Sequence, residues 1–226
     1  MTSKTFETDR LPTSGGDLEI ACLGHGSLLF THDGKRIYVD PFGRVADYAT
    51  LPKADLVLIT HEHQDHLDPD ALDKIRTGQT DVICTERCAE RIEGGQPMRN
   101  GDMTVVRGLQ IEAIPAYNLI HRRENGDPFH PCGVGNGYVV TFGDLRVLIA
   151  GDTENTPELK AQTEIDVAFL PMNLPYTMTP AMVADVAVAI RPRILYPYHF
   201  GSTDTSELVE LLRDHPEIEV RIRNLG

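Results

Sequence analysis

Short apolar runs separated by polar turns dominate the first half of the chain, a pattern typical of β-strands. Asp33-Gly34 and Gly143-Asp144 each lie between two such runs and predict tight hairpin turns. The predicted strands cover residues 18–23, 27–31, 36–40, 55–60, 81–84, 104–106, 109–114, 137–142, 145–150, 167–170, 194–196 and 220–222.

Helices are predicted by a repeated start signal, in which a side chain that can cap a helix precedes a proline at the first helical position. A last helix is predicted over residues 206–214, with three candidate capping residues before it. Strand runs followed by helices fit two packed sheets with helices outside, although the pattern also permits other α+β or doubly wound arrangements. The start signals are Asp68-Pro69, Thr156-Pro157 and Thr179-Pro180, and the last of these helices should end before Pro192.

The largest cluster of possible metal ligands in the sequence follows the predicted strand at residues 55–60 directly. It is the run His61-Glu62-His63-Gln64-Asp65-His66. His61 and His63 alternate by two, so in extended backbone they point to the same side. Imidazole nitrogen and carboxylate oxygen suit zinc, manganese, iron or nickel. The run therefore predicts a metal site at one end of a sheet.

Further candidate ligands follow later predicted strands. Asp152 follows the strand at residues 145–150, and His199 follows the strand at residues 194–196. His121 and His130 lie in the polar segment after residues 109–114. Ligands at the ends of separate strands allow a rigid sheet to position a metal cluster.

Length and charge limit the classes of protein that the chain fits. Its 226 residues predict a single domain over residues 17–226, preceded by a loose polar tail at residues 1–16. The formal net charge of −13 argues against nucleic-acid binding and against adhesion to an anionic membrane. The sequence has no long apolar run and no signal-like start, so we expect a cytoplasmic protein that acts on a small molecule, as a monomer or a homo-oligomer.

The order of these motifs resembles the metallo-β-lactamase-fold superfamily. Within it, the chain is most similar to small hydrolases related to L-ascorbate-6-phosphate lactonase, and then to the N-acyl-phosphatidylethanolamine phospholipase D group. The resemblance extends from about residue 17 to the end and implies an α/β (α+β) fold with four layers, the αββα sandwich. It rests on His61–His66 together with Gly24-His25-Gly26-Ser27, Val39-Asp40-Pro41-Phe42, Pro115-Ala116-Tyr117-Asn118, Pro128-Phe129-His130-Pro131 and Ala150-Gly151-Asp152-Thr153.

The resemblance also implies a ligand set for two divalent ions, zinc first, with manganese, nickel or iron as alternatives. A hydroxide between the ions would attack an ester, lactone or phosphodiester, and Asp65 and Asp152 are the predicted catalytic residues. One ion would be held by His61, His63 and a middle histidine, the other by Asp65, His66 and His199, and Asp152 would bridge them.

The middle ligand is where the chain departs from the family. Many relatives have a histidine where this chain has Asn118, and asparagine is a poor ligand for such metals. We predict that His130 fills this position, with His121 as the alternative.

Other residues are candidates for supporting roles. Asp40 could orient a ligand histidine or simply cap a strand end. His25 and Tyr176 could contact substrate or remain ordinary turn and packing residues. The adjacent Arg122 and Arg123 could clamp a phosphate or carboxylate or remain solvated surface arginines.

Two other functions fit the same resemblance. Diiron oxidoreductases of the fold usually replace the second histidine of the run by glutamate, and His63 is present here, which favours hydrolysis. A non-catalytic metal-binding module is the other alternative.

Overall fold

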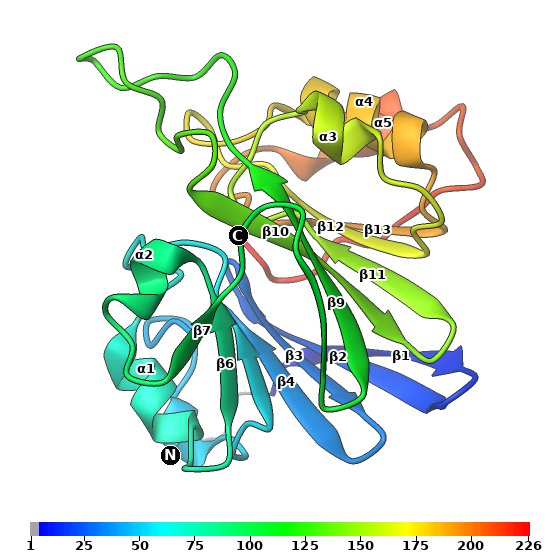
Figure 1. The fold of residues 1–226 in the computed structure, drawn as a ribbon. Helices are drawn as coiled ribbons and strands as arrows, with labels where there is room; N and C mark the ends of the chain where they lie inside the picture. Colours follow the sequence, from blue (N-terminus) through cyan, green and yellow to red (C-terminus); the bar gives the residue numbers. More distant parts are fainter. Residues whose placement is uncertain (1–4) are drawn as a thin grey trace.

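The computed structural model describes residues 5–226 and consists of four layers (Figure 1). Two seven-stranded sheets face each other, in the orders β1-β2-β3-β4-β5-β6-β7 and β14-β13-β12-β11-β10-β9-β8. Helices α1 and α2 cover the outer side of the first sheet, and α3, α4 and α5 cover the outer side of the second. The expected αββα sandwich is confirmed.

The first sheet begins antiparallel and becomes parallel from β4 onward. This change matters because parallel neighbours bring their carboxyl ends to the same edge of the sheet. Its elements are β1 (Glu7–Thr13), β2 (Gly16–Gly24), β3 (Ser27–His32), β4 (Lys35–Val39), η1 (Tyr48–Thr50), β5 (Leu56–Leu58), α1 (Pro69–Ile75), β6 (Asp81–Cys84), α2 (Glu86–Ala89) and β7 (Gly95–Pro97).

The second sheet also begins antiparallel, over β8 to β11, and becomes parallel over β11, β12, β13 and β14. The segment between β9 and β10, residues 117–134, extends from the sandwich as a long arm (Figure 1). The elements are β8 (Met103–Val106), β9 (Leu109–Ala116), β10 (Gly135–Phe142), β11 (Leu145–Ile149), α3 (Pro157–Lys160), β12 (Val167–Pro171), α4 (Pro180–Ile190), β13 (Ile194–Tyr198), α5 (Thr205–Leu211) and β14 (Glu219–Val220).

Local signals placed the helix starts and the first hairpin correctly. The side chains of Asp68, Thr156 and Thr179 accept backbone N–H groups at the starts of α1, α3 and α4. Asp204 caps α5, which settles the choice left open at that helix. Gly34 has a φ of 72° in the hairpin turn between β3 and β4, a conformation that glycine adopts without strain.

The main core lies between the sheets, where Phe30 packs against Phe142 with ring centroids 5.4 Å apart. Two further apolar clusters lie between each sheet and its helices. Burial on both faces fixes the sheets rigidly, because a close-packed interior resists displacement. Within residues 5–226, no helix is both long and apolar enough to cross a membrane.

The predicted loose tail is wrong for residues 7–16, because residues 7–13 form β1, which pairs antiparallel with β2. Residues 5 and 6 have no regular secondary structure, and residues 1–4 of that prediction lie outside the described residues. β1 is held by contacts that no local pattern shows: Asp9 accepts hydrogen bonds from Tyr196 Oη (2.9 Å) and from Arg223 Nη2 (2.8 Å). These partners are 187 and 214 residues away in the chain.

Asp9→Asn should lower the free energy of unfolding by about 1–2 kcal/mol at neutral pH, because it weakens this charged contact. Although burial opposes it, hydrogen bonds from Arg223 and Tyr196 lower the pKa of Asp9 below its ordinary value of 3.8. The stabilisation is therefore present above pH 3.8 and is lost as the pH falls through the lowered pKa.

Urea unfolding of wild type and Asp9→Asn from neutral to acidic pH would measure this difference. Asp33→Asn is a suitable control, because Asp33 is exposed and, within residues 5–226, forms its one ion pair with Lys35. A difference for Asp9→Asn that does not shrink in acid would contradict the assignment.

Candidate metal centre

Polar side chains from both sheets meet at one edge of the sandwich. Each follows the end of a strand or lies in the turn between two strands, so the packed sheets fix its backbone. The residues are His25 between β2 and β3, Asp40 after β4, His61–His66 after β5, Asp152 after β11 and His199 after β13.

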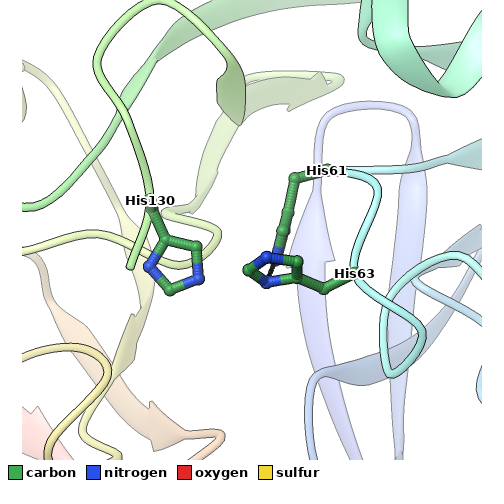
Figure 2. A group of neighbouring side chains, drawn as sticks. All are labelled: His61, His63 and His130. Carbon is green, nitrogen blue, oxygen red and sulfur yellow. Dashed lines mark hydrogen bonds between the residues drawn. The ribbon is translucent and has the colours of Figure 1, made fainter. Parts of the chain in front are cut away.

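Three histidines form the first group of possible ligands, and Figure 2 shows their rings facing one another. His61 Nε2 lies 3.0 Å from His63 Nδ1. The His130 ring comes from the arm, with its centroid 5.1 Å from that of His61 and 5.0 Å from that of His63. The arm thus brings its histidine to the side chains of the loop after β5.

Asp65, His66 and His199 form a neighbouring cluster. His199 Nε2 lies 3.2 Å from His66 Nε2 and 3.3 Å from Asp65 Oδ2. His25 Nε2 also lies 3.0 Å from Asp65 Oδ2, and the rings of His25 and His199 are 3.7 Å apart. His25 therefore contacts the candidate ligand Asp65 and does not stand apart in its turn.

Asp152 lies between the two groups. Its Oδ2 is 3.2 Å from His130 Nε2, and its Oδ1 is 3.5 Å from His66 Nε2 and 3.8 Å from His199 Nε2. The carboxylate is buried, and Oδ1 has no hydrogen-bond donor among residues 5–226. A buried carboxylate oxygen without a donor is costly, and a cation between Oδ1 and the histidines would relieve that cost.

Asp40 orients His66 directly and His61 through Thr60. Its Oδ2 lies 2.7 Å from His66 Nδ1 and accepts the hydroxyl proton of Thr60 at 2.6 Å. Thr60 Oγ1, having donated that proton, can accept from His61 Nδ1 at 3.0 Å. Both imidazoles then keep Nε2 as the free lone pair directed at the site, which is the tautomer that a metal requires.

Asn118 orients the third histidine. Its Oδ1 accepts from the backbone N–H of His130 at 2.7 Å and from Nδ1 of the same residue at 2.9 Å. The His130 lone pair on Nε2 then faces Asp152. Asn118 thus holds in place the histidine that the sequence analysis predicted as the middle ligand.

Glu154 fastens the base of the arm. Its buried carboxylate accepts the backbone N–H groups of Leu119, Ile120 and His121, each at 2.7 Å, and Nδ2 of Asn118 at 3.0 Å. His121 Nδ1 lies 2.7 Å from the same carboxylate. His121 is therefore held by Glu154 through its backbone N–H and belongs to none of the three groups of possible ligands within residues 5–226.

The backbone at this edge is unusual. His25, Asp40 and His199 have φ values of 54°, 43° and 46°, which side chains other than glycine adopt at a cost. Gly151 has a φ of 67°, and a Cβ there would lie 2.7 Å from Asn136 O, so glycine is needed immediately before Asp152. Of the seven non-glycine residues in the described chain that have a positive φ, three therefore lie at this edge.

The charges of the site suit a cation. Burial, reinforced by His66, lowers the pKa of His61 well below its ordinary value. Although burial opposes it, His199 and His66 hold the pKa of Asp152 well below the usual range. Asp152 and Asp40 raise the pKa of His66 against the effect of burial, so a bound cation would displace a proton from that ring.

A cavity of about 420 Å³ opens over the site. Asp65 and Tyr176, both predicted from the sequence, line it, whereas Arg122 does not; Arg122 Nη1 donates to Gly126 O and lines an outer pocket. Sequence reasoning missed Thr60 and Glu154, whose roles depend on partners farther along the chain. The wall of the cavity also contains Arg123, which the sequence suggested together with Arg122, and the residues Gln64 and Phe129.

Comparisons with known proteins agree with this geometry. A family described as the β-lactamase superfamily domain matches residues 19–199. A metal-dependent hydrolase of Methanopyrus kandleri is 31% identical over 221 residues, covering 92% of this chain and 93% of its own.

Two solved structures are also similar. One, from Parabacteroides distasonis and assigned as a metal-dependent hydrolase, superposes with a TM-score of 0.94 at 46% identity, over 98% of this chain and 100% of its own. Igni18, described as a metallo hydrolase of Ignicoccus hospitalis, gives a TM-score of 0.76 at 24% identity, over 92% of this chain and 96% of its own, and shows the shared fold.

Proposed function

The chain belongs to the β-lactamase superfamily, and from this premise we propose that it is a metal-dependent hydrolase with two divalent ions, acting on a small ester, lactone or phosphodiester. The observation that carries the proposal is the buried Asp152 carboxylate, which lies within 4 Å of a ring nitrogen of four histidines and whose Oδ1 has no donor among residues 5–226. Zinc is the first candidate because imidazole and carboxylate ligands predominate.

The two groups of side chains would each hold one ion. His61, His63 and His130 would hold the first, Asp65, His66 and His199 the second, and Asp152 would contribute to both. When bound, the ions would lower the pKa of water to supply hydroxide near neutral pH and would neutralise charge that develops on the substrate.

Asp65 is the proposed residue for orienting the attacking water. It is partly exposed and lines the cavity, and its Oδ2 already accepts from His25 Nε2. Although burial opposes it, His199 and His25 lower the pKa of Asp65, so its carboxylate is a weak base. Its contribution is therefore to position the water and its proton and to hold His25 in place.

The remaining residues would support binding. Asp40 and Asn118 keep the ligand rings in one tautomer and one orientation, which limits the reorganisation needed during reaction. Tyr176 lies on the cavity wall, against the ring of Phe129 at 5.0 Å, where it can contact substrate. The cavity of about 420 Å³ suits a small molecule.

Metal analysis combined with hydrolysis assays would test the proposal. We expect protein purified without added metal to contain about two equivalents of zinc, manganese or nickel. Chelation should remove hydrolysis of p-nitrophenyl esters, lactones or bis(p-nitrophenyl) phosphate, and the returned metal should restore it.

The same experiment can reject the proposal. Iron as the sole metal, with oxygen consumption and no hydrolysis, would favour an oxidoreductase. Bound metal with no activity towards any of the three bond types would favour a non-catalytic module. The intact His63 and the absence of a glutamate at that position support hydrolysis.

A further inference from the structure

Arg123 adds a positive charge to the wall of the cavity over the site. From its position we propose that the substrate carries a terminal anion, a carboxylate or a phosphate, that binds Arg123 while the bond to be cleaved lies at the metal-binding side chains. This inference rests on the proposed hydrolase function and specifies its substrate class.

The structure leaves the guanidinium of Arg123 available for a ligand. Its Nη2 donates to Phe129 O at 3.2 Å, and Cζ lies over the Phe129 ring, 5.1 Å from the centroid. Among residues 5–226 it forms no ion pair with a carboxylate. Packing on Phe129 holds the side chain in place, while its remaining N–H donors keep no acidic partner.

The charges around Arg123 favour an anionic ligand at this cavity. The protein has a net charge of −13, and most of the arginines in residues 5–226 form an ion pair with a carboxylate, as Arg99 does with Glu86. The carboxylates of the cavity, Asp65 and Asp152, face histidines of the metal site. A guanidinium at this cavity therefore offers the charge that an anionic substrate needs in an otherwise acidic protein.

A tight turn in the arm places Arg123, and not Arg122, at the wall of the cavity over the site. The arm turns tightly here, because Arg123 N donates to Asp127 O at 2.7 Å and Gly126 N donates to Arg123 O at 2.9 Å. Arg122, one residue earlier, donates to Gly126 O and lines only the outer pocket. Both arginines are exposed, carry the same charge and lie side by side in the arm, so Arg122 is a matched control.

Paired substrates test the inference. The probes are p-nitrophenyl esters of straight acyl chains that end in a methyl group, a carboxylate or a phosphate, assayed on the metal-loaded protein. We expect Arg123→Gln to lower kcat/KM for the anionic esters about tenfold, because a charge-assisted hydrogen bond is lost. The neutral esters should change less than about twofold, and Arg122→Gln should behave like wild type on all of them. The end group that Arg123→Gln affects more distinguishes carboxylate from phosphate.

A binding measurement separates this inference from the proposed function. The p-nitroanilide analogues of the same anionic chains resist hydrolysis, so calorimetry on the loaded protein gives their Kd without turnover. A Kd about tenfold weaker in Arg123→Gln, with Arg122→Gln unchanged, would support the anion site even if no ester were hydrolysed. The anion site would be overturned if the three proteins had equal Kd values, or if neither anionic amide bound to wild type. It would also be overturned if Arg123→Gln lowered kcat/KM equally for neutral and anionic esters.

Discussion

Asp152→Asn should reduce hydrolysis by about 10³-fold or more and should lower metal content at both groups of ligands. The substitution keeps the shape of the side chain but removes the negative charge that lies between His130 on one side and His66 and His199 on the other. An amide can offer one oxygen to one side only, so it cannot replace a carboxylate that serves both.

Metal analysis and steady-state kinetics on the purified variant would measure this. Asp185→Asn is the matched control, because Asp185 lies on α4, away from the site, and contacts Asn155 and Lys160. Far-ultraviolet circular dichroism should be unchanged in both variants. Full metal content together with wild-type rates in Asp152→Asn would remove the main observation behind the proposed function.

His130→Ala should lose about one equivalent of metal and about 10²-fold in hydrolysis, whereas His121→Ala should keep both within about twofold of wild type. The two histidines lie in the same segment between β9 and β10. Only His130 reaches the first group, with Nε2 3.2 Å from Asp152 Oδ2, while His121 is held by Glu154.

Metal stoichiometry of the two variants under one set of conditions decides between the histidines. His121→Ala also controls for loosening of the arm, because it removes a side chain that contacts Glu154. Equal metal content in wild type and His130→Ala would reject His130 as a ligand. Loss of metal in His121→Ala alone would restore the alternative ligand.

The sequence alone predicted the features that are formed by neighbours along the chain. Three helix starts were correct because the capping side chain and the proline act within one turn. The run from His61 to His66 was recognisable for the same reason, since its spacing and the strand before it lie within about a dozen residues. β7 was missed because its three residues, Gly95–Pro97, contain a glycine and a proline and show no alternation.

The tertiary structure decided everything that depends on distant partners. β1 exists because β2 pairs with it and because Tyr196 and Arg223 bind Asp9, so its polar sequence gave no local signal. The choice of His130 over His121 depends on where Asn118 and Glu154 hold the arm, and the choice of Arg123 over Arg122 depends on a turn within it. Residue types and short spacings supply the possible ligands, whereas their assembly into one site comes from the long-range packing of two sheets, which a one-dimensional pattern does not contain.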